Sequence, residues 1–292
     1  MTRPSLAVAV VCVVLLAGCG AGGDRGGGRT VNPALAGTPT ASPTPTPAPD
    51  YPPGVTADGV DVRALTAAHD RALVRRNSTV RFSRTVVAAD GTTLATRESV
   101  TEHAGDRLGF RLVANGSLPG EPDPALRSFA FWTNGSVTAI RSVNGTGAVS
   151  YQVVPGRPAT LTGVDDSGEG LVFAAFAGTD ARVAGTATVD GEEMTVIRAE
   201  HDRLNRSGRP TVRNLTAVAY VTDEGVVRSF ELRYTATYGE GDDAVVATTT
   251  ERFRATVGDT AAAPPDWVDE AIRTGSDGSD EDGDGDGGTG GT

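Results

Sequence analysis

The residue best suited to chemistry in this sequence is Cys19, which ends the segment Leu16-Ala17-Gly18-Cys19. This segment closes an apolar stretch over residues 6–18, and Arg3 supplies one positive charge ahead of it. Such a stretch suits a secretory signal peptide and is too short for the roughly 20 residues of a membrane-spanning helix. Cleavage before Cys19 would leave its thiol at a new N-terminus, free to take a lipid. We therefore predict a signal peptide at residues 1–18 and lipid attachment at Cys19.

The four residues around the predicted cleavage point also form a known pattern. They resemble the lipobox of prokaryotic lipoproteins, with Leu16, Ala17 and Gly18 as the recognised residues. Cys19 is then the residue that carries the lipid. Arg3 is not followed by a second arginine, which favours the general secretory route over the twin-arginine route. The resemblance implies a lipid-anchored protein on the outer face of the cytoplasmic membrane, and an ordinary cysteine near an uncleaved anchor is the alternative.

Catalytic groups are scarce in the rest of the chain. No cysteine follows Cys19, so there is no further thiol for nucleophilic, zinc or redox chemistry. The sequence has no nucleophile elbow, Walker loop or His-Glu-x-x-His zinc helix. In the pairs His69-Asp70 and His201-Asp202, neighbouring side chains point to different faces of a helix or strand, so we predict surface or half-buried histidines rather than general bases. We expect no catalytic residue, no metal site and no cofactor, and therefore no enzyme.

The charged residues are unusual in kind and in balance. All 26 basic residues are arginines, against 37 acidic residues, and the net charge is -11. This acidic surface argues against nucleic acid and against an anionic membrane face as partners. The composition resembles that of a surface protein from a halophilic archaeon. Residues 274–292 carry six of the acids and no base, and we predict a disordered acidic tail there.

Every asparagine beyond residue 55 begins an Asn-x-Ser/Thr sequence, which is the acceptor for N-glycosylation. Three of the six are followed by glycine, and turn chemistry offers an alternative reason for those Asn-Gly pairs. The other three lack this explanation. The candidate glycosylation sites are Asn77, Asn115, Asn134, Asn144, Asn205 and Asn214.

Composition divides the mature chain into a tether, one domain and the acidic tail. Residues 19–55 are rich in glycine, proline and threonine, which favours coil and extended polyproline II structure between the lipid and the domain. Residues 56–273 have the size of a single domain. We therefore predict a lipidated tether over 19–55, one folded domain over 56–273 and the tail over 274–292.

Two helices and a closing turn are predicted in this domain. Apolar residues recur at helical spacing over residues 62–76, with Asp61 as the N-cap and arginines near the C-terminal end. Residues 166–177 form a shorter helical pattern between two groups of strands. A proline stop over residues 263–265 precedes a short helical turn that closes the domain. The expected anchors of that turn are Trp267, Val268 and Ile272.

The rest of the domain has the period of two that half-buried strands show, most clearly in residues 228–238. Asp-Gly, Asn-Gly and Glu-Gly pairs punctuate these runs as hairpin turns, and short links force antiparallel neighbours. The fold class is therefore mainly β (α+β), a long antiparallel meander of about ten or eleven strands. The predicted strands cover residues 79–89, 92–103, 107–114, 127–133, 136–142, 148–154, 181–189, 193–200, 211–222, 228–238 and 244–257.

The order of these elements and the closing Pro-Asp-Trp-Val sequence resemble a haloarchaeal family of surface lipoproteins of unknown function. More distantly, they are similar to the lipoprotein-carrier group of LolA and LppX. That resemblance implies a curled antiparallel half-barrel with the N-terminal and mid-chain helices on its concave face. It also implies a lipid or other amphipathic ligand in an apolar cavity, and it transfers no ligand contact to any residue.

Two interpretations of the domain interior stay open. An inner face of alanine, valine and threonine could leave an apolar cavity for a carried ligand. The same small residues could instead pack tightly, which fits a structural or protein-interaction module of the cell envelope with a filled core. The residues identify neither the ligand nor a protein partner.

Overall fold

The computed structural model describes residues 50–120, 126–158, 161, 167–204, 210–258 and 260–277. The chain divides into two units, Met1–Ala48 and Pro49–Thr292, and all described residues belong to the second. Several predicted features therefore lie outside the described residues. They are Leu16, Ala17, Gly18, Cys19, the tether up to residue 49, Asn205 and residues 278–292.

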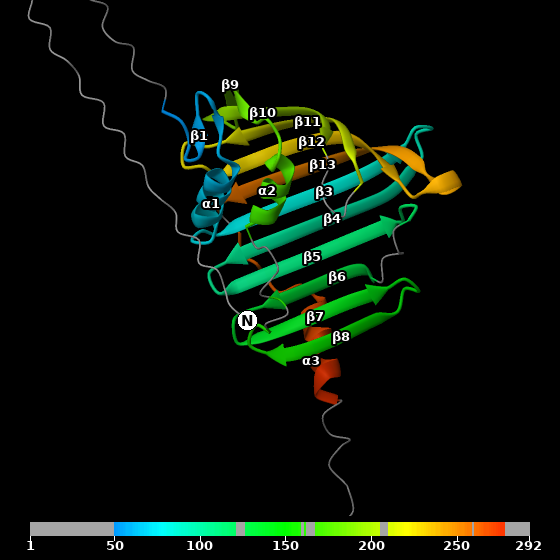
Figure 1. The fold of residues 1–292 in the computed structure, drawn as a ribbon. Coiled ribbons are helices and arrows are strands. Elements are labelled where there is room, and N and C mark those ends of the chain that lie inside the picture. The colour runs from blue at the N-terminus through cyan, green and yellow to red at the C-terminus, as the bar shows by residue number, and fades with distance from the viewer. Residues whose placement is uncertain are drawn as a thin grey trace, which may run out of the picture. The chain divides into compact units, whose positions relative to one another are not determined.

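Eleven strands form one antiparallel sheet in the second unit (Figure 1). Each of the eleven predicted strands is present. A small hairpin of β1 (Val55–Thr56) and β2 (Gly59–Val60) precedes them and was not predicted. The strands of the large sheet are β3 (Ser78–Ala88), β4 (Thr93–Ala104), β5 (Arg107–Gly116), β6 (Leu126–Thr133), β7 (Val137–Asn144), β8 (Val149–Pro155), β9 (Arg182–Val189), β10 (Glu192–Leu204), β11 (Val212–Val221), β12 (Val227–Tyr238) and β13 (Val245–Val257).

The sheet consists of two meanders placed side by side. Strands β3 to β8 form one and β9 to β13 form the other, and β13 pairs with β3 at the junction, where Phe253 lies opposite Phe82. After β8 the chain passes through helix α2 (Glu169–Phe176) to the opposite edge, where β9 begins. The predicted antiparallel meander is present within each group, and the pairing of β13 with β3 was not predicted, because turn signals specify hairpins and not the pairing of distant strands. The edge strands β8 and β9 do not pair with each other, so the sheet stays open, and the predicted half-barrel is confirmed.

Short-range chemistry explains where the first two helices begin. In α1 (Val62–Leu73), the carboxylate of Asp61 accepts hydrogen bonds from two backbone N–H groups of the first turn at 3.0 and 3.1 Å, which confirms the predicted N-cap. α2 begins after Gly168, whose φ of 77° suits glycine. A Cβ at Gly168 would lie 2.5 Å from the ring of Phe253, so the close approach of α2 to the sheet requires a residue without a side chain.

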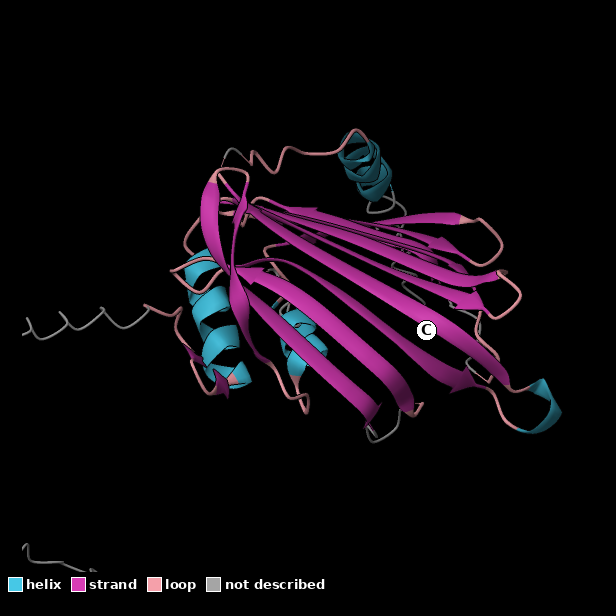
Figure 2. Ribbon diagram, turned by 90° about the horizontal axis from the view of Figure 1, so that it is seen from above, coloured by secondary structure: helices cyan, strands magenta, loops and turns pink. Residues whose placement is uncertain are grey.

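The three α-helices of the described residues lie on the two faces of the sheet (Figures 1 and 2). α1 and α2 lie on the concave face, where they pack against β3 and β10–β13, as predicted. Helix α3 (Trp267–Asp277) lies on the opposite face, which we call the α3 face, and packs on β7 and β8. Its buried residues include Val268 and Ala271, whereas Ile272, predicted as an anchor, is 42% exposed. That prediction failed because the helix is longer than the expected turn and places Ile272 on its outer side.

Candidate functional site

The half of the concave face beneath α1 and α2 is filled by side chains. Phe230 and Phe253 stack with ring centroids 5.0 Å apart, and Phe176 of α2 meets Phe230 edge-on at 6.1 Å. Leu65 from α1 and Val172 from α2 are fully buried in the same cluster. Of the two interpretations of the domain interior, a packed core therefore applies to this half of the concave face, and an empty apolar cavity does not.

His69 is completely buried in this core, although a surface or half-buried histidine was predicted. Its Nδ1 accepts a hydrogen bond from the N–H of Val227 at 3.1 Å, so Nε2 carries the proton and donates to the carbonyl of Ser167 at 2.9 Å. The ring also meets Phe253 edge-on at 5.7 Å. His69 thus ties α1 to β12 and to the segment before α2. Local spacing could not reveal this role, because the partners lie 98 and 158 residues away in the sequence.

A different surface lies on the concave face at β5 and β6. Phe110, Phe129 and Phe131 form a cluster there, with ring centroids 5.6 to 6.3 Å apart. Phe131 is buried, whereas Phe110 and Phe129 are half-buried, and Leu161 packs against the cluster. Among the described helices, none lies over these strands on this face (Figure 1). We call these three rings the aromatic patch, in which Phe110 and Phe129 expose part of their apolar surface above the buried Phe131.

A polar cluster lies on the same face, on β3, β12 and β13. Nη2 of Arg84 donates to the hydroxyl of Tyr238 at 3.0 Å, and Tyr238 shares a 2.8 Å hydrogen bond with the hydroxyl of Thr249. The hydroxyl of Tyr234 donates to the Glu251 carboxylate at 3.1 Å, and that oxygen lies 3.8 Å from Nε of Arg84. This Nε is buried and has no hydrogen-bond acceptor among the described residues. A buried donor without an acceptor costs free energy, so Arg84 is suited to receive an acceptor atom from a ligand.

Burial and neighbouring groups set the ionisation of this cluster. Burial alone would lower the pKa of the Arg84 guanidinium. Its interactions with Tyr234, Tyr238 and Glu251 have a larger combined effect, so the pKa is raised. Burial, reinforced by Glu251, holds the pKa of the Tyr234 hydroxyl above its ordinary value. The guanidinium of Arg84 is therefore charged and the Tyr234 hydroxyl is neutral at neutral pH, and the Glu251 carboxylate lies beside this charge. A pocket of about 140 Å³ between Arg84 and Leu118 has room for a polar head group but not for a whole lipid.

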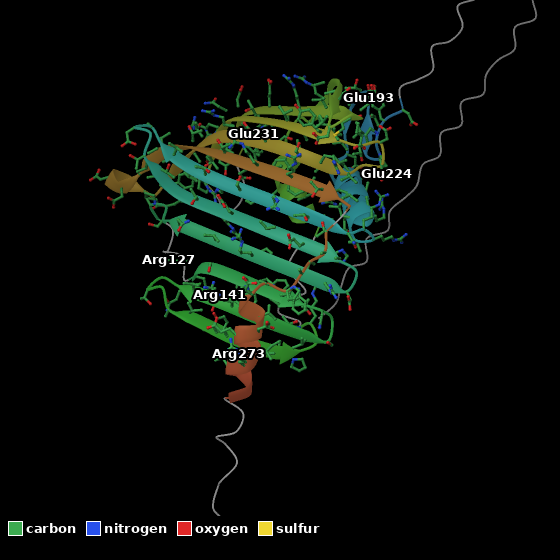
Figure 3. All side chains as sticks on the ribbon, turned by 180° about the vertical axis from the view of Figure 1, so that it is seen from behind. Arg127, Arg141, Glu193, Glu224, Glu231 and Arg273 are labelled. Carbon is green, nitrogen blue, oxygen red and sulfur yellow. The ribbon has the colours of Figure 1, made fainter. Side chains whose placement is uncertain are left out.

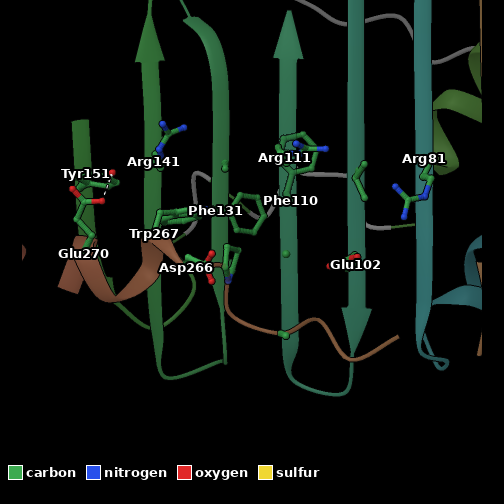
Figure 4. A pocket seen from close by; sticks show the side chains of 15 residues that line it. Arg81, Glu102, Phe110, Arg111, Phe131, Arg141, Tyr151, Asp266, Trp267 and Glu270 are labelled. Atoms are coloured by element: carbon green, nitrogen blue, oxygen red, sulfur yellow. Dashed lines mark hydrogen bonds between the residues drawn. The ribbon is translucent and has the colours of Figure 1, made fainter. Parts of the chain in front are cut away.

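Two open pockets of about 720 and 700 Å³ lie on the α3 face and meet at Arg81, Val100 and Arg111. Figure 4 shows the first, with arginines from β3, β5 and β7 and with α3 beside Tyr151. The hydroxyl of Tyr151 donates to the Glu270 carboxylate at 2.9 Å, which joins β8 to α3 at the end of the groove. Sequence reasoning missed this groove and the Arg84 cluster, because each combines residues from strands that only the register brings together.

The described glycosylation candidates fall into two groups. Asn134 and Asn144 lie in hairpin turns, and their Oδ1 atoms accept hydrogen bonds from backbone N–H groups of the turn. The hydroxyls of Ser136 and Thr146 donate to the same oxygens, so turn chemistry accounts for both Asn-x-Ser/Thr sequences. Exposed asparagines without such a turn hydrogen bond among the described residues are Asn77, Asn115 and Asn214.

Groups for acid-base or metal chemistry do not converge in the part of the chain that the structure describes. No three histidine, cysteine or acidic side chains there come close enough to hold a metal ion. His201 is half-buried, as predicted, and its Nδ1 lies 3.9 Å from a carboxylate oxygen of Asp180. Over the same described ranges, no helix combines the length and the apolar character that crossing a membrane requires.

The fold defines an open antiparallel half-barrel with helices on both faces. The chain belongs to a family of unknown function, DUF7537, whose model matches residues 5–271. A search of the curated proteins gives no match. Among solved structures, the chain is similar to a DUF1329 family protein from Desulfovibrio piger ATCC 29098, at 8% identity and a TM-score of 0.26, over 73% of this chain and 97% of that chain. It is also similar to LprF from Mycobacterium bovis, at 10% identity and a TM-score of 0.32, over 70% and 95% of the two chains, and neither likeness identifies a ligand.

Proposed function

We propose that this protein is a non-catalytic, lipid-anchored surface protein that binds a lipid or other amphipathic ligand on the concave face of its half-barrel. The apolar part of the ligand lies on the aromatic patch. The observation that supports this most strongly is that Phe110 and Phe129 are only half-buried on the inner face of the sheet. Aromatic surface left in contact with water is unfavourable, and a contiguous patch of it typically serves binding.

The polar end of the ligand lies at Arg84. Phe129 is in register with Phe82 through Ser99 and Leu112, and Phe82 is two residues from Arg84 on β3. Phe129 lies three strands from Arg84, at about 4.8 Å for each step across the sheet, and two residues from it along the strand direction, at about 3.4 Å each. Because these two directions are perpendicular, the distance between the two residues is roughly 16 Å. One single-chain amphiphile can bridge that distance. Its head group would supply the acceptor that Nε of Arg84 lacks among the described residues.

Native mass spectrometry tests the proposed binding. The measurement uses a Cys19→Ser background, so that any lipid seen is bound without a covalent bond. We expect the purified chain to carry an amphiphile of discrete mass, and the added Phe110→Ser and Phe129→Ser substitutions to remove it. A ligand-free chain, or an adduct that survives both substitutions, would count against a ligand on the aromatic patch.

The anchor and the surface location rest on the sequence. In the proposal, residues 1–18 are removed, Cys19 carries the lipid, and the acidic, lysine-free chain works at the surface of a halophilic archaeon. Changing Cys19→Ser should move the protein from the membrane to the medium or leave an unprocessed precursor. Unchanged processing and lipidation would contradict the anchor.

Mass analysis of glycopeptides tests the proposed glycans, which we expect first at the exposed Asn77, Asn115 and Asn214.

A further inference from the structure

The sheet register aligns three arginines on the α3 face. Residues directly opposite one another on successive strands run from Arg81 through Val100, Arg111 and Ala130 to Arg141. Arginines therefore occur on every second strand, about 9.5 Å apart, with one small apolar residue between each pair. We call Arg81, Arg111 and Arg141 the arginine row (Figure 4).

The arginine row differs from neighbouring arginines in having no acidic partner among the residues that the structure describes. Over the described ranges, its three guanidinium groups form no ion pair and no hydrogen bond. On the adjacent β13, Arg252 pairs with Glu231 at 2.8 Å and Arg254 pairs with Asp190 at 3.3 Å. In a chain with a net charge of -11, three aligned cations without partners form a surface complementary to an extended anion.

Small residues make this surface a trough. Its floor includes Gly109, where an added Cβ would have no neighbour closer than 3.9 Å, together with Val100 and Ala130. The segment before α3 forms one wall. It is held on the sheet by the indole N–H of Trp132, which donates to the carbonyl of Ala262 at 2.9 Å. The trough is therefore open along the arginine row and bounded at the α3 end.

The sequence that follows α3 is acidic. Residues 278–292, which directly follow α3, contain five acidic residues and no base. Figure 3 shows α3 crossing β7 and β8 close to Arg141. The five acidic residues are Asp280, Glu281, Asp282, Asp284 and Asp286.

The length of this segment is sufficient to return to the row. Trp267 lines the same pocket as Arg141, and Asp277 lies ten residues further along α3, about 15 Å of helix. Asp286 is nine residues beyond Asp277 and can lie up to about 30 Å from it. The carboxylates can therefore fold back over α3 and reach the nearer arginines.

We propose that residues 278–292 dock in the trough and pair their carboxylates with Arg141 and Arg111. An exposed pair of this kind is weak by itself, but attachment to α3 keeps the carboxylates at an effective concentration in the millimolar range. The docked segment covers Arg141 and Arg111 and competes with free polyanions for them, and added salt weakens the contact. This contact is independent of the ligand on the concave face.

The absence of lysine from the sequence permits a direct test. In a full chain with Arg141→Lys, the new amine is the only side-chain amine, and a carbodiimide can join it to a carboxylate in contact with it. We expect a cross-linked peptide between position 141 and residues 278–292, with a yield independent of protein concentration. The matched control is Arg63→Lys on α1, which is exposed on the concave side and should give no such peptide.

Three cross-linking results would overturn the proposal. The first is a link from position 141 only to the nearby Asp266 or Glu270. The second is an equal yield of the peptide from the Arg63→Lys control. The third is a link that forms only between two chains, which would assign the acidic segment to a second copy.

Competition with an external polyanion provides a second test. Polyglutamate serves as the probe, and all five acidic residues of 278–292 are changed to their amides in the full chain. We expect the amide variant to bind polyglutamate about five-fold more tightly than the unmodified chain in low salt, and both to bind equally in high salt. Equal binding in low salt would mean that the trough is open, and it would refute docking.

Discussion

The two faces of strands β3 to β7 differ in chemistry although they share one backbone. On the concave face, β5 and β6 present Phe110, Phe129 and Phe131, which contact one another. On the α3 face, β5 presents Gly109 and Arg111 and β6 presents Ala130 at the alternating positions. On β5, side-chain alternation thus directs the Phe110 ring to the concave face and the Arg111 guanidinium to the α3 face. The comparison teaches that each face can be altered separately, because neighbouring residues on one strand belong to different surfaces.

The largest expected difference between the faces concerns stability. Phe253→Ala removes a buried ring from the stack beneath α2 and should lower the free energy of unfolding by about 3–5 kcal/mol. The matched control is the next residue, where Arg254→Ala on the α3 face removes one exposed ion pair and should cost less than about 1 kcal/mol. Denaturant unfolding of both variants measures the difference. Similar losses would show that the concave core does not dominate the stability of the domain.

A smaller loss is expected from the buried histidine. His69→Leu keeps most of the volume but leaves the N–H of Val227 and the carbonyl of Ser167 without this partner, so we expect a loss of about 1–3 kcal/mol. His201→Leu, at a half-buried position on β10, should change stability by less than about 0.5 kcal/mol. Calorimetry measures the melting temperatures of both variants. Equal melting temperatures for His69→Leu and His201→Leu would reject the bridging role of His69.

The approach of α2 to the sheet can be tested with two glycines. Gly168→Ala places a Cβ 2.5 Å from the Phe253 ring and forces a side chain onto a φ of 77°, which should cost about 1–2 kcal/mol. Gly145→Ala, in the turn between β7 and β8, meets no atom within 4 Å and should be neutral. A melting temperature for Gly168→Ala that equals that of Gly145→Ala would show that α2 can move away from the sheet without cost.

Local signals predicted much of the fold and little of the site. Period-two alternation and Gly-containing turns identified all eleven strands, and the Asp61 carboxylate could be assigned as an N-cap because its partners lie two and three residues away. The pairing of β13 with β3 joins residues such as Phe253 and Phe82, which are far apart in the sequence and carry no local signal of their contact. The Arg84 cluster, the arginine row and the bonds of His69 depend on that long-range register. They could be found only once the strand order was known.

Binding of one amphiphile to two matched variants tests the proposed function most directly. A fluorescent anthroyloxy-stearate is titrated into the unmodified chain, into Phe129→Ser on the concave face and into Trp267→Ser on the α3 face. We expect Phe129→Ser to weaken binding about ten-fold, because it removes roughly 1.4 kcal/mol of apolar contact, and Trp267→Ser to leave the affinity unchanged. Loss of binding in Trp267→Ser with normal binding in Phe129→Ser would place the ligand on the α3 face and contradict the concave site.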